Sequence, residues 1–578
     1  MLIDTGREVI FMFLLNPKKY ERPFKDEKTN EIFQKTIDFF ENKGLQSIKE
    51  DDQDLTFCDD YLEFNREAGA LATLLTPAGY GAPDSRWDMN RIAQYNEILA
   101  FYGLSYQYNY QVTILGIGPL WMGDNEKIKH KTAELLKDGG IFAFGLSEKE
   151  HGADLYANEM KLYRNNGGTY TANGEKYYIG NGNKAALVST FGRYEDNNEY
   201  VFFAVETTHP NYECVKKINT SGNRPGYVAE YALNKYPITD DEILSNGGLA
   251  WDSALNTINV GKFQLGFASI GICTHALYEG VNHSYNRWLY GHRVTDFPHI
   301  RKIYTESLMR LIAMRLYAFR AIDYFRSASD EDRRYLLYNP IQKMKVTTQG
   351  MKIIDTMLDA VAAKGFEQDT YFELAIRDIG MIPRLEGTTH VNMALVIKFM
   401  KNYFFDPVDY PEIVKRDDIA NDDYILNQTA GSLRNIKFPH YLKAYEGITT
   451  PNIEIFKEQI ETFRQLLLKA GPTAEQAKNV DYMLALGEIF TMVAYAQLVL
   501  ENAKINNIEN EIVDEIFNFM IRDISGYALN LILNFNNEEA QENYLYKIIK
   551  KPAYNKEISD KVWEEHVLSL IGCYEMNP

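Results

Sequence analysis

Cysteine is scarce in this sequence: the chain of 578 residues has four, at positions 58, 214, 273 and 573, and no CxxC pair. This spacing excludes a disulfide-stapled scaffold and a cysteine-rich metal cluster, and it predicts a reducing, cytoplasmic location. The longest apolar run near the N-terminus, Ile10–Leu15, has six residues. Such a run is too short for a signal-peptide core or a membrane span. We therefore expect no metal ion and no transmembrane segment.

Positive charge is also in short supply. The chain has 61 lysines and arginines against 80 aspartates and glutamates, a net charge of −19. This excess argues against nucleic acid or an anionic membrane as the main partner, although a local basic pocket for phosphates remains possible. Hydrophobic residues make up 45% and charged residues 24%, the balance of a large globular protein with several domains.

Several common catalytic signatures do not occur. The sequence has no HExxH, no GxSxG and no Walker lysine loop. The glycine pieces Gly116–Gly118 and Gly180–Gly182 lack a complete GxGxxG between a strand and a helix. They predict ordinary turns rather than phosphate-binding loops.

Apolar periodicity divides the chain into four parts. Residues 1–140 show helical spacing, as in 31–40 and 91–104, and residues 141–248 are rich in strand signals. Residues 249–405 return to long helical segments, such as 306–325 and 341–364. Residues 406–578 form a further helical domain, whose apolar stretch 482–500 needs a partner surface and should pack on the core. This order predicts a mainly α protein with a central β domain, and it excludes a Rossmann alternation.

The middle part carries the clearest local turn signal. Asn173-Gly174, between strand-like flanks, predicts a hairpin turn with two residues at positive φ. Tyr200–Val205 and Tyr227–Leu233 predict further strands.

Chemistry-bearing segments follow one another in a distinctive order: 142–154, 174–182, 287–291 and 376–390. In this order and spacing they resemble the acyl-CoA dehydrogenase family of flavoproteins, over roughly residues 60–405. The insertion 294–301 and the long C-terminal part resemble a long bacterial branch, which includes long-chain and methylthiopropanoyl-CoA dehydrogenases. The resemblance implies a helical N-terminal domain, a β-barrel-like middle domain, a four-helix-bundle domain and a helical C-terminal extension.

The resemblance also implies a reaction, the α,β-dehydrogenation of an acyl-CoA thioester to the trans-2-enoyl-CoA, as in fatty-acid β-oxidation. Glu386, in Leu385-Glu386-Gly387-Thr388, matches the family's catalytic base. We expect it at a loop-to-helix junction, in a dry, apolar pocket that raises its pKa. From the residues alone, Glu386 is also a candidate helix N-terminal carboxylate that pairs with the helix dipole.

The family's cofactor, FAD, is implied together with a set of contact residues. Flavin contacts match Phe144, Leu146, Ser147, Ala153, Tyr178, Gly180, Arg287, Thr388 and His390, and substrate contacts match Asn259 and Lys262. Arg287 matches an arginine that reaches the FAD of the neighbouring subunit, so we expect a homodimer or tetramer. Strand packing for Tyr178 and a solvated helix charge for Arg287 are the plainer alternatives.

The sequence departs from the family pattern at three places. Gly180 replaces a usual threonine whose hydroxyl reaches flavin N5, Ala153 replaces a common serine, and segment 359–365 replaces a glycine-rich flavin contact. The expected electron acceptor is an electron-transferring flavoprotein. The alternatives are an oxidase that passes electrons to oxygen, and a catalytically idle scaffold relative.

Overall fold

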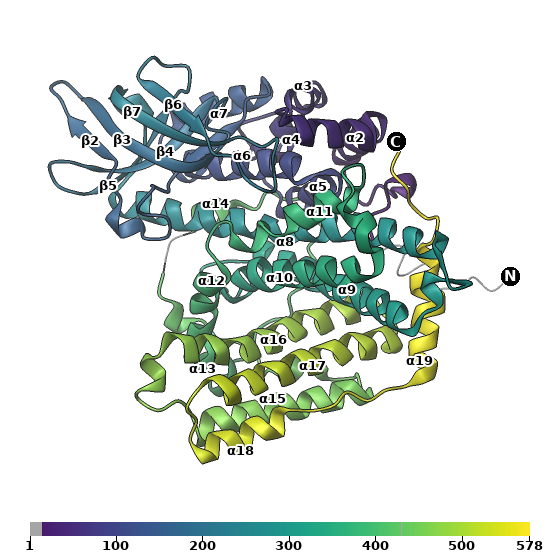
Figure 1. Ribbon diagram of the computed structural model, residues 1–578. Coiled ribbons are helices and arrows are strands. Elements are labelled where there is room, and N and C mark those ends of the chain that lie inside the picture. The colour runs from purple at the N-terminus through teal and green to yellow at the C-terminus, as the bar shows by residue number, and fades with distance from the viewer. Residues whose placement is uncertain (1–13, 429–430) are drawn as a thin grey trace.

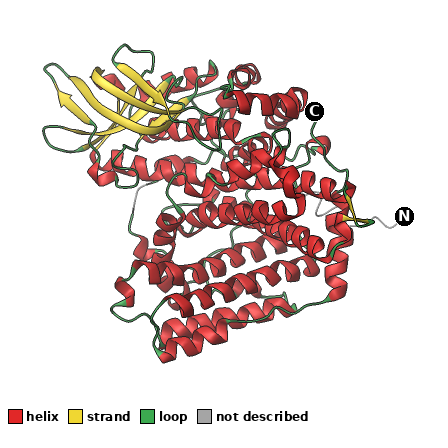
Figure 2. Cartoon of the chain, in the orientation of Figure 1, coloured by secondary structure: helices red, strands yellow, loops and turns green. Residues whose placement is uncertain are grey.

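The computed structural model describes residues 14–428 and 431–578, so part of the apolar run Ile10–Leu15 lies outside the described residues. The sheet and the N-terminal helices lie side by side, the long bundle helices run beneath them, and the C-terminal helices form the layers below (Figure 1). Figure 2 shows that helices predominate and that the large sheet lies at one end. The predicted mainly helical architecture with a central β domain is confirmed. The four domain boundaries stay a prediction.

The N-terminal part is helical, as its periodicity predicts. Its helices are α2 (Glu27–Asp54), α3 (Asp59–Ala68), α4 (Ala70–Leu75), α5 (Met89–Tyr102), α6 (Leu104–Met122) and α7 (Glu126–Lys137). The Asp26 side chain caps α2 by accepting from the Thr29 N–H, and Asp88 caps α5 in the same way. Gly103 separates α5 from α6, so the predicted segment 91–104 belongs to two helices.

Helix α6 is buried along its whole length, and two glycines let it approach its neighbours closely. A Cβ at Gly116 would lie 2.6 Å from the backbone nitrogen of Ala143, and one at Gly118 would lie 2.4 Å from Thr257 Oγ1. The prediction that Gly116–Gly118 forms a turn is therefore wrong. Both glycines are helical residues selected by close packing rather than by backbone freedom.

The middle part forms an eight-stranded sheet. Its strands are β1 (Phe142–Gly145), β2 (Lys161–Arg164), β3 (Thr169–Gly180), β4 (Leu187–Tyr194), β5 (Tyr200–Val205), β6 (Tyr212–Lys217), β7 (Val228–Thr239) and β8 (Ile243–Asn246). The order is β6-β7-β3-β2-β4-β5-β8, and β1 pairs in parallel with β4. The strands predicted at 200–205 and 227–233 are confirmed as β5 and as the first half of β7.

The hairpin predicted at Asn173-Gly174 is wrong. β3 runs through this dipeptide as one twelve-residue strand, with a register shift against β7 between Ala172 and Gly174. A Cβ at Gly174 would lie 3.1 Å from the Cα of Met160, so this glycine serves a bulge and a close approach. The chain instead reverses at Gly167 and Gly168, which have φ of 77° and 72°.

The third part is a helical bundle. Its helices are α8 (Gly247–Asn286), α9 (Pro298–Arg326), α10 (Tyr335–Val361), α11 (Tyr371–Ile379), α12 (Thr389–Val396) and α13 (Met400–Phe405), with a small hairpin of β9 (Trp288–Leu289) and β10 (His292–Arg293) between α8 and α9. The first half of α8 packs on β5 and β8, and α8 also packs on α5, α6 and α10. Helix α8 thus connects the sheet with the far end of the bundle.

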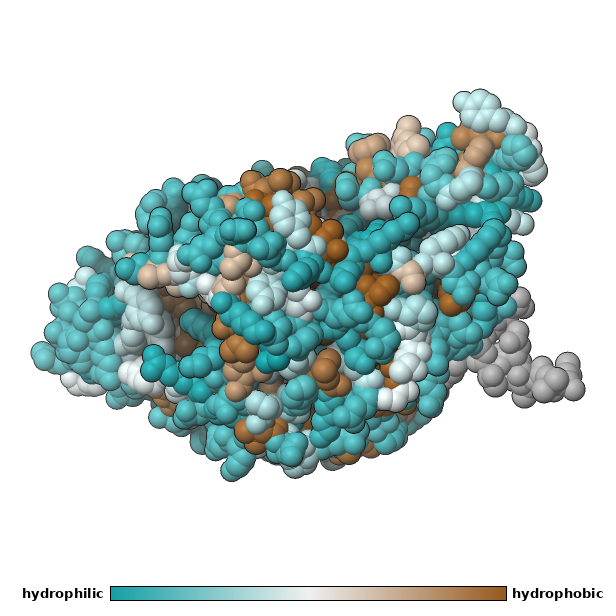
Figure 3. Space-filling model, turned by 90° about the horizontal axis from the view of Figure 1, so that it is seen from below, coloured by the Kyte–Doolittle hydropathy of each residue, from teal (hydrophilic) through white to brown (hydrophobic). Residues whose placement is uncertain are grey.

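The C-terminal part is helical and docked, as predicted. Its helices are α14 (Asp423–Asn427), α15 (Pro451–Lys469), α16 (Val480–Ile505), α17 (Asn510–Asn534), α18 (Glu539–Ile548) and α19 (Lys556–Lys561). Among the described residues, α16 is the helix long and apolar enough to cross a membrane, but 78% of its most apolar stretch is buried inside the protein. It packs on α9, α12 and α17 as a core helix does. Seen from below, the molecule is mostly hydrophilic, with scattered hydrophobic residues (Figure 3).

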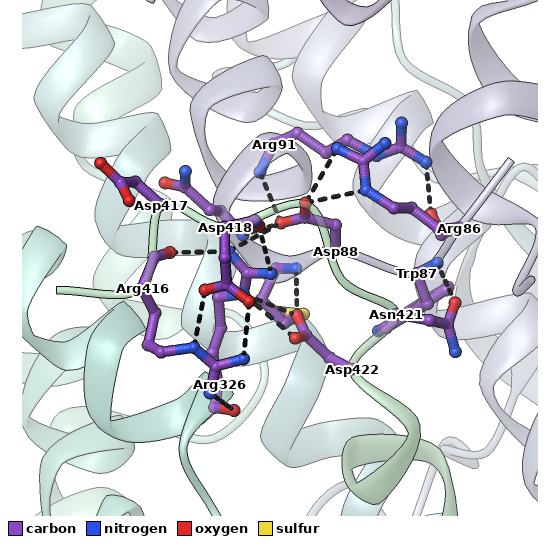
Figure 4. A network of polar contacts seen from close by, with 12 residues as sticks. Arg86, Trp87, Asp88, Arg91, Arg326, Arg416, Asp417, Asp418, Asn421 and Asp422 are labelled. Atoms are coloured by element: carbon purple, nitrogen blue, oxygen red, sulfur yellow. Dashed lines mark hydrogen bonds and ion pairs between the residues drawn. The ribbon is translucent and has the colours of Figure 1, made fainter. Parts of the chain in front are cut away.

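A buried ionic network joins three parts of the chain (Figure 4). Arg326, at the end of α9, donates from Nε to both carboxylate oxygens of Asp422, at 3.0 and 3.1 Å. Asp422 also accepts from the backbone N–H of Met89, the first residue of α5. Both ionic side chains are almost completely excluded from solvent. The segment that leads into the C-terminal helices is therefore fixed to both helical parts before it.

We expect Asp422→Asn to destabilise the fold, because it leaves the buried Arg326 charge without its closest counter-charge. Removing one partner of a buried pair costs about 3 kcal/mol. Calorimetry should show a clearly lower melting temperature. Lys556→Met, which breaks the exposed pair with Asp560, should change the melting temperature little. Equal effects of the two substitutions would contradict the role of the network.

Candidate active site

Glu386 lies in the short loop between residues 382–384 and α12. Its φ is +50° and that of Gly387 is +86°, so two successive residues take left-handed conformations. Thr388 caps α12 by accepting from the Val391 N–H. The expected loop-to-helix junction is confirmed. Because Thr388 provides the cap, Glu386 is not the carboxylate that pairs with this helix end.

The Glu386 carboxyl points inward, between α6 and α8. Its Oε1 accepts a hydrogen bond from Gln111 Nε2 of α6, whereas its Oε2 is buried without a hydrogen-bond partner among the described residues. A Cβ at Gly261 of α8 would lie 2.8 Å from Oε2, so a glycine leaves the space that the carboxyl needs. The backbone of the loop is partly exposed while the carboxyl group itself is enclosed.

Two lysines complete the surroundings of this carboxyl. Lys343 of α10 donates from Nζ to the carbonyls of Pro383 and Gly387, which stand on either side of Glu386. Lys262 of α8 is buried, and its charge acts on Glu386. The expectation of an apolar pocket is therefore wrong: α6, α8 and α10 each contribute a polar side chain.

Burial favours the uncharged form of all three groups and shifts their pKa values accordingly. It raises the pKa of Glu386 to about 8, while Lys343, Lys262 and the Gln111 hydrogen bond act in the opposite direction. Burial also lowers the pKa of Lys262 to about 8 and that of Lys343 to about 7, and the Glu386 charge opposes both shifts. The expected rise of the Glu386 pKa is confirmed in direction and cause.

The end of β3 forms the other wall of the site. Ser147 and Tyr177 are joined twice, through Ser147 Oγ to the Tyr177 carbonyl and through the Tyr177 N–H to the Ser147 carbonyl. Behind them, the buried Lys176 ammonium pairs with Glu148 at 2.8 Å. Tyr178 has a φ of +65° and its side chain is 37% exposed, so its ring stands at the margin of the sheet.

Helix α6 bridges the two walls. A Cβ at Gly180 would lie 2.8 Å from the Tyr108 hydroxyl and 2.7 Å from Val112 Cγ2. The Tyr108 side chain interacts electrostatically with both Tyr178 and Glu386. It therefore occupies the space that a threonine at 180 would need. In the sequence, the glycine at 180 in place of the family's threonine was the sign that another side chain, here Tyr108, fills this space. Nothing in the sequence pointed to Gln111 or Lys343.

The remaining candidate residues lie in different settings. Phe144 is half-buried in β1 and Leu146 is buried just after it, and Asn259 is buried with an Nδ2 that has no partner among the described residues. Ala153, Thr388 and His390 are exposed. Arg287 follows the last residue of α8. A helix of 40 residues spans about 60 Å, and the β9–β10 hairpin beside Arg287 lies at the opposite end of the molecule from the sheet (Figure 2). Within one chain Arg287 is remote from this site.

The residues fit a flavin and a thioester in this place. Two buried polar atoms, Glu386 Oε2 and Asn259 Nδ2, have no hydrogen-bond partner among the described residues, so they can bond a polar ligand. The half-exposed Tyr178 ring offers a stacking surface, and Gly180 presents backbone without a side chain. The nearby Lys176 charge is already committed to Glu148, so the pyrophosphate of a dinucleotide needs a cation from elsewhere.

Known proteins match this chain in its middle part and in its helical bundle. The acyl-CoA dehydrogenase middle domain matches residues 143–235, and the acyl-CoA dehydrogenase C-terminal domain matches residues 248–401. The short-chain-specific acyl-CoA dehydrogenase of Megasphaera elsdenii is 22% identical over 62% of this chain and 93% of its own length.

Two solved structures extend the comparison. An acyl-CoA dehydrogenase from Bacillus anthracis, complexed with FAD, has a TM-score of 0.74 at 17% identity and covers 97% of this chain and 99% of its own. Butyryl-CoA dehydrogenase from Megasphaera elsdenii has a TM-score of 0.60 at 21% identity, over 65% of this chain and 98% of its own. The first of these structures thus extends the likeness of fold to the C-terminal helices.

The fold is that of the FAD-dependent acyl-CoA dehydrogenases, which are oxidoreductases. Two parts of this chain, residues 143–235 and 248–401, match domains of the acyl-CoA dehydrogenase family.

We expect activity to depend on pH with the sign set by Glu386. A base must be ionised, and burial raises this pKa to about 8. Therefore kcat/KM for flavin bleaching by an acyl-CoA should rise with pH up to about 8 and level off above it. Lys262→Met removes a cation that lowers the Glu386 pKa, so it should move the midpoint of this pH profile to higher pH. A midpoint near pH 4.5 in both proteins would exclude Glu386 in this environment.

Proposed function

We propose that this protein catalyses the α,β-dehydrogenation of an acyl-CoA thioester to its trans-2-enoyl-CoA, with Glu386 removing the α-proton. The observation that carries this proposal is the buried Glu386 carboxyl. Gln111 of α6 bonds one of its oxygens, and the other, beside Gly261 of α8, has no hydrogen-bond partner among the described residues. A carboxylate without a partner, in a place where burial raises its pKa, is suited to accept a proton.

The surrounding residues prepare this base. Lys343 holds both carbonyls that flank it, so the loop keeps the carboxyl turned inward. Lys262 and Lys343 limit the rise in pKa, and a useful fraction of Glu386 stays ionised near neutral pH. FAD, when bound, supplies the acceptor for the hydride that leaves the β-carbon. Asn259 and Lys262 are the proposed substrate contacts.

The proposed FAD site is the end of β3 with the segments beside it. The flavin would lie against Phe144, Leu146, Ser147, Ala153, Tyr178, Gly180, Thr388 and His390. The remote position of Arg287 supports its assignment to the FAD of a neighbouring subunit, and hence a homodimer or tetramer. A cation from a second copy would meet the need for charge at the pyrophosphate, because Lys176 is committed to Glu148.

We further propose a role in β-oxidation, a cytoplasmic location and an electron-transferring flavoprotein as acceptor. An oxidase is the alternative within the same fold, and oxygen consumption by the reduced enzyme separates the two. Bleaching by butyryl-, octanoyl- or palmitoyl-CoA would exclude an idle scaffold and would give the chain-length preference.

Glu386→Gln should abolish bleaching while FAD stays bound. The amide is nearly isosteric but cannot accept the α-proton, and general-base assistance is worth roughly 10²–10⁴-fold. Stopped-flow absorbance measures the rate and the flavin spectrum gives the occupancy. Glu279→Gln removes a different buried carboxylate, on α8 and away from the site, whose pKa burial also raises, and this variant should bleach normally. Normal bleaching by Glu386→Gln would refute the proposed base.

Mixing two inactive variants tests whether Arg287 serves a neighbouring subunit. Arg287→Leu should lose FAD affinity, and Glu386→Gln should keep FAD without activity. In a mixed dimer, one site combines an intact Glu386 with the other subunit's Arg287, so refolding the two variants together should restore part of the bleaching. If the mixture stays inactive while mixed dimers form, Arg287 acts within its own chain or not at all.

A further inference from the structure

Four buried amide side chains run in a line from the interior of the bundle to Glu386. They are Gln264 of α8, Asn96 of α5, and Gln107 and Gln111 of α6, each at most 1% exposed. Asn96 donates to Gln264 Oε1 at 3.2 Å, and Gln107 donates to Asn96 Oδ1 at 2.8 Å and to Gln111 Oε1 at 3.4 Å. Gln111 then donates to Glu386 Oε1. Buried amides are costly unless they are paired, and each of the four takes part in at least one of these hydrogen bonds.

Backbone carbonyls fix the direction of these hydrogen bonds. Asn96 donates to the carbonyl of Ile92 at 2.9 Å, and Gln264 donates to that of Val260 at 3.4 Å. A carbonyl can only accept, so each of these amides must turn its NH₂ group towards the backbone. The oxygen of Asn96 then faces Gln107, which must present its own NH₂ group. At the end of the line, the Gly261 carbonyl requires the NH₂ group of Gln111 on the side of Glu386.

The direction matters because an N–H donor favours the ionised carboxylate. A carboxyl facing an amide oxygen would be stabilised in its protonated form, which is useless as a base. The other groups that face this carboxyl are Lys262 from α8, Lys343 from α10 and Tyr108 from α6. The lysines also favour ionisation, but only while they are charged. The amides have no titratable proton in this range and donate at every working pH.

We infer that Gln111 is a positioning residue for Glu386, and that the amides behind it hold its NH₂ group towards the carboxylate. This inference rests on the proposed role of Glu386 as the base. Gln111 touches the base rather than the reacting carbon, so its contribution is to the protonation and aim of Glu386.

The test is the pH dependence of bleaching in Gln111→Met, which keeps the side-chain length and removes the donor. The midpoint of kcat/KM should move upward by about one pH unit, because the carboxylate loses a hydrogen bond that lowers its pKa. Gln111→Glu places a like charge beside the base and should move it further. Gln107→Met leaves Gln111 in place but frees its orientation, so it should shift the midpoint in the same direction by less. The probe is whichever of butyryl-, octanoyl- and palmitoyl-CoA bleaches the parent enzyme fastest.

A second readout does not depend on activity. The infrared carboxyl band that disappears in Glu386→Gln reports protonated Glu386, and its titration in Gln111→Met should shift in parallel with the kinetics. Gln459→Met is the matched control, since it removes an equally buried amide in the C-terminal helices. It should lower the melting temperature without moving either midpoint.

The outcomes separate the two claims. If Glu386→Gln bleaches normally, the proposed base is wrong and this inference falls with it. If Glu386→Gln is inactive but folded Gln111→Met and Gln107→Met keep the parent midpoint in both readouts, only the inference is overturned. Should Gln111→Met fail to fold, a parent midpoint in Gln107→Met and Gln111→Glu overturns it equally.

Discussion

The close approach of α6 to its two neighbours is the constraint on which the site depends. Gly116 lets the helix touch β1 and Gly118 lets it touch α8, at distances that leave no room for a side chain. Both contacts fix the rotation of α6 about its axis. Tyr108 and Gln111, three residues apart, then share one helical face, so Tyr108 meets the sheet margin and Gln111 meets Glu386. The distance between the sheet wall and the loop that carries Glu386 is thereby set by a single rigid element.

Around α6, the protein buries one carboxyl and two ammonium groups. Burial disfavours the charged forms of Glu386, Lys262 and Lys343. It therefore raises the pKa of the carboxyl to about 8 and lowers those of the two ammonium groups to about 8 and about 7. Lys343 has a second task, because its bonds to the Pro383 and Gly387 carbonyls hold the left-handed backbone at Glu386. The strain of that loop and the desolvation of its carboxyl are therefore offset by the same ammonium group.

Local sequence patterns predicted most helices and strands correctly, and packing between distant segments explains the predictions that were wrong. Tyr200–Val205 is a short apolar run that predicts a strand, and it forms β5. The turn signal Asn173-Gly174 instead lies inside β3, at a bulge that packs against Met160. Glu386 was found because its neighbours in sequence resemble those of a known family. Gln111 and Lys343 could not be found in this way, since they come from helices far away in the chain and carry no local motif. The polar nature of the pocket was missed for the same reason.

The docking of α16 has a consequence for how copies of this chain can associate. Helices α16 and α17 lie against α9, and α16 also covers part of α10 and α12. Butyryl-CoA dehydrogenase matches 65% of this chain, so a large part of this chain has no counterpart there. Here the bundle meets a partner within its own polypeptide, at a fixed one-to-one ratio and independent of protein concentration. Any contact between copies must therefore form on other surfaces.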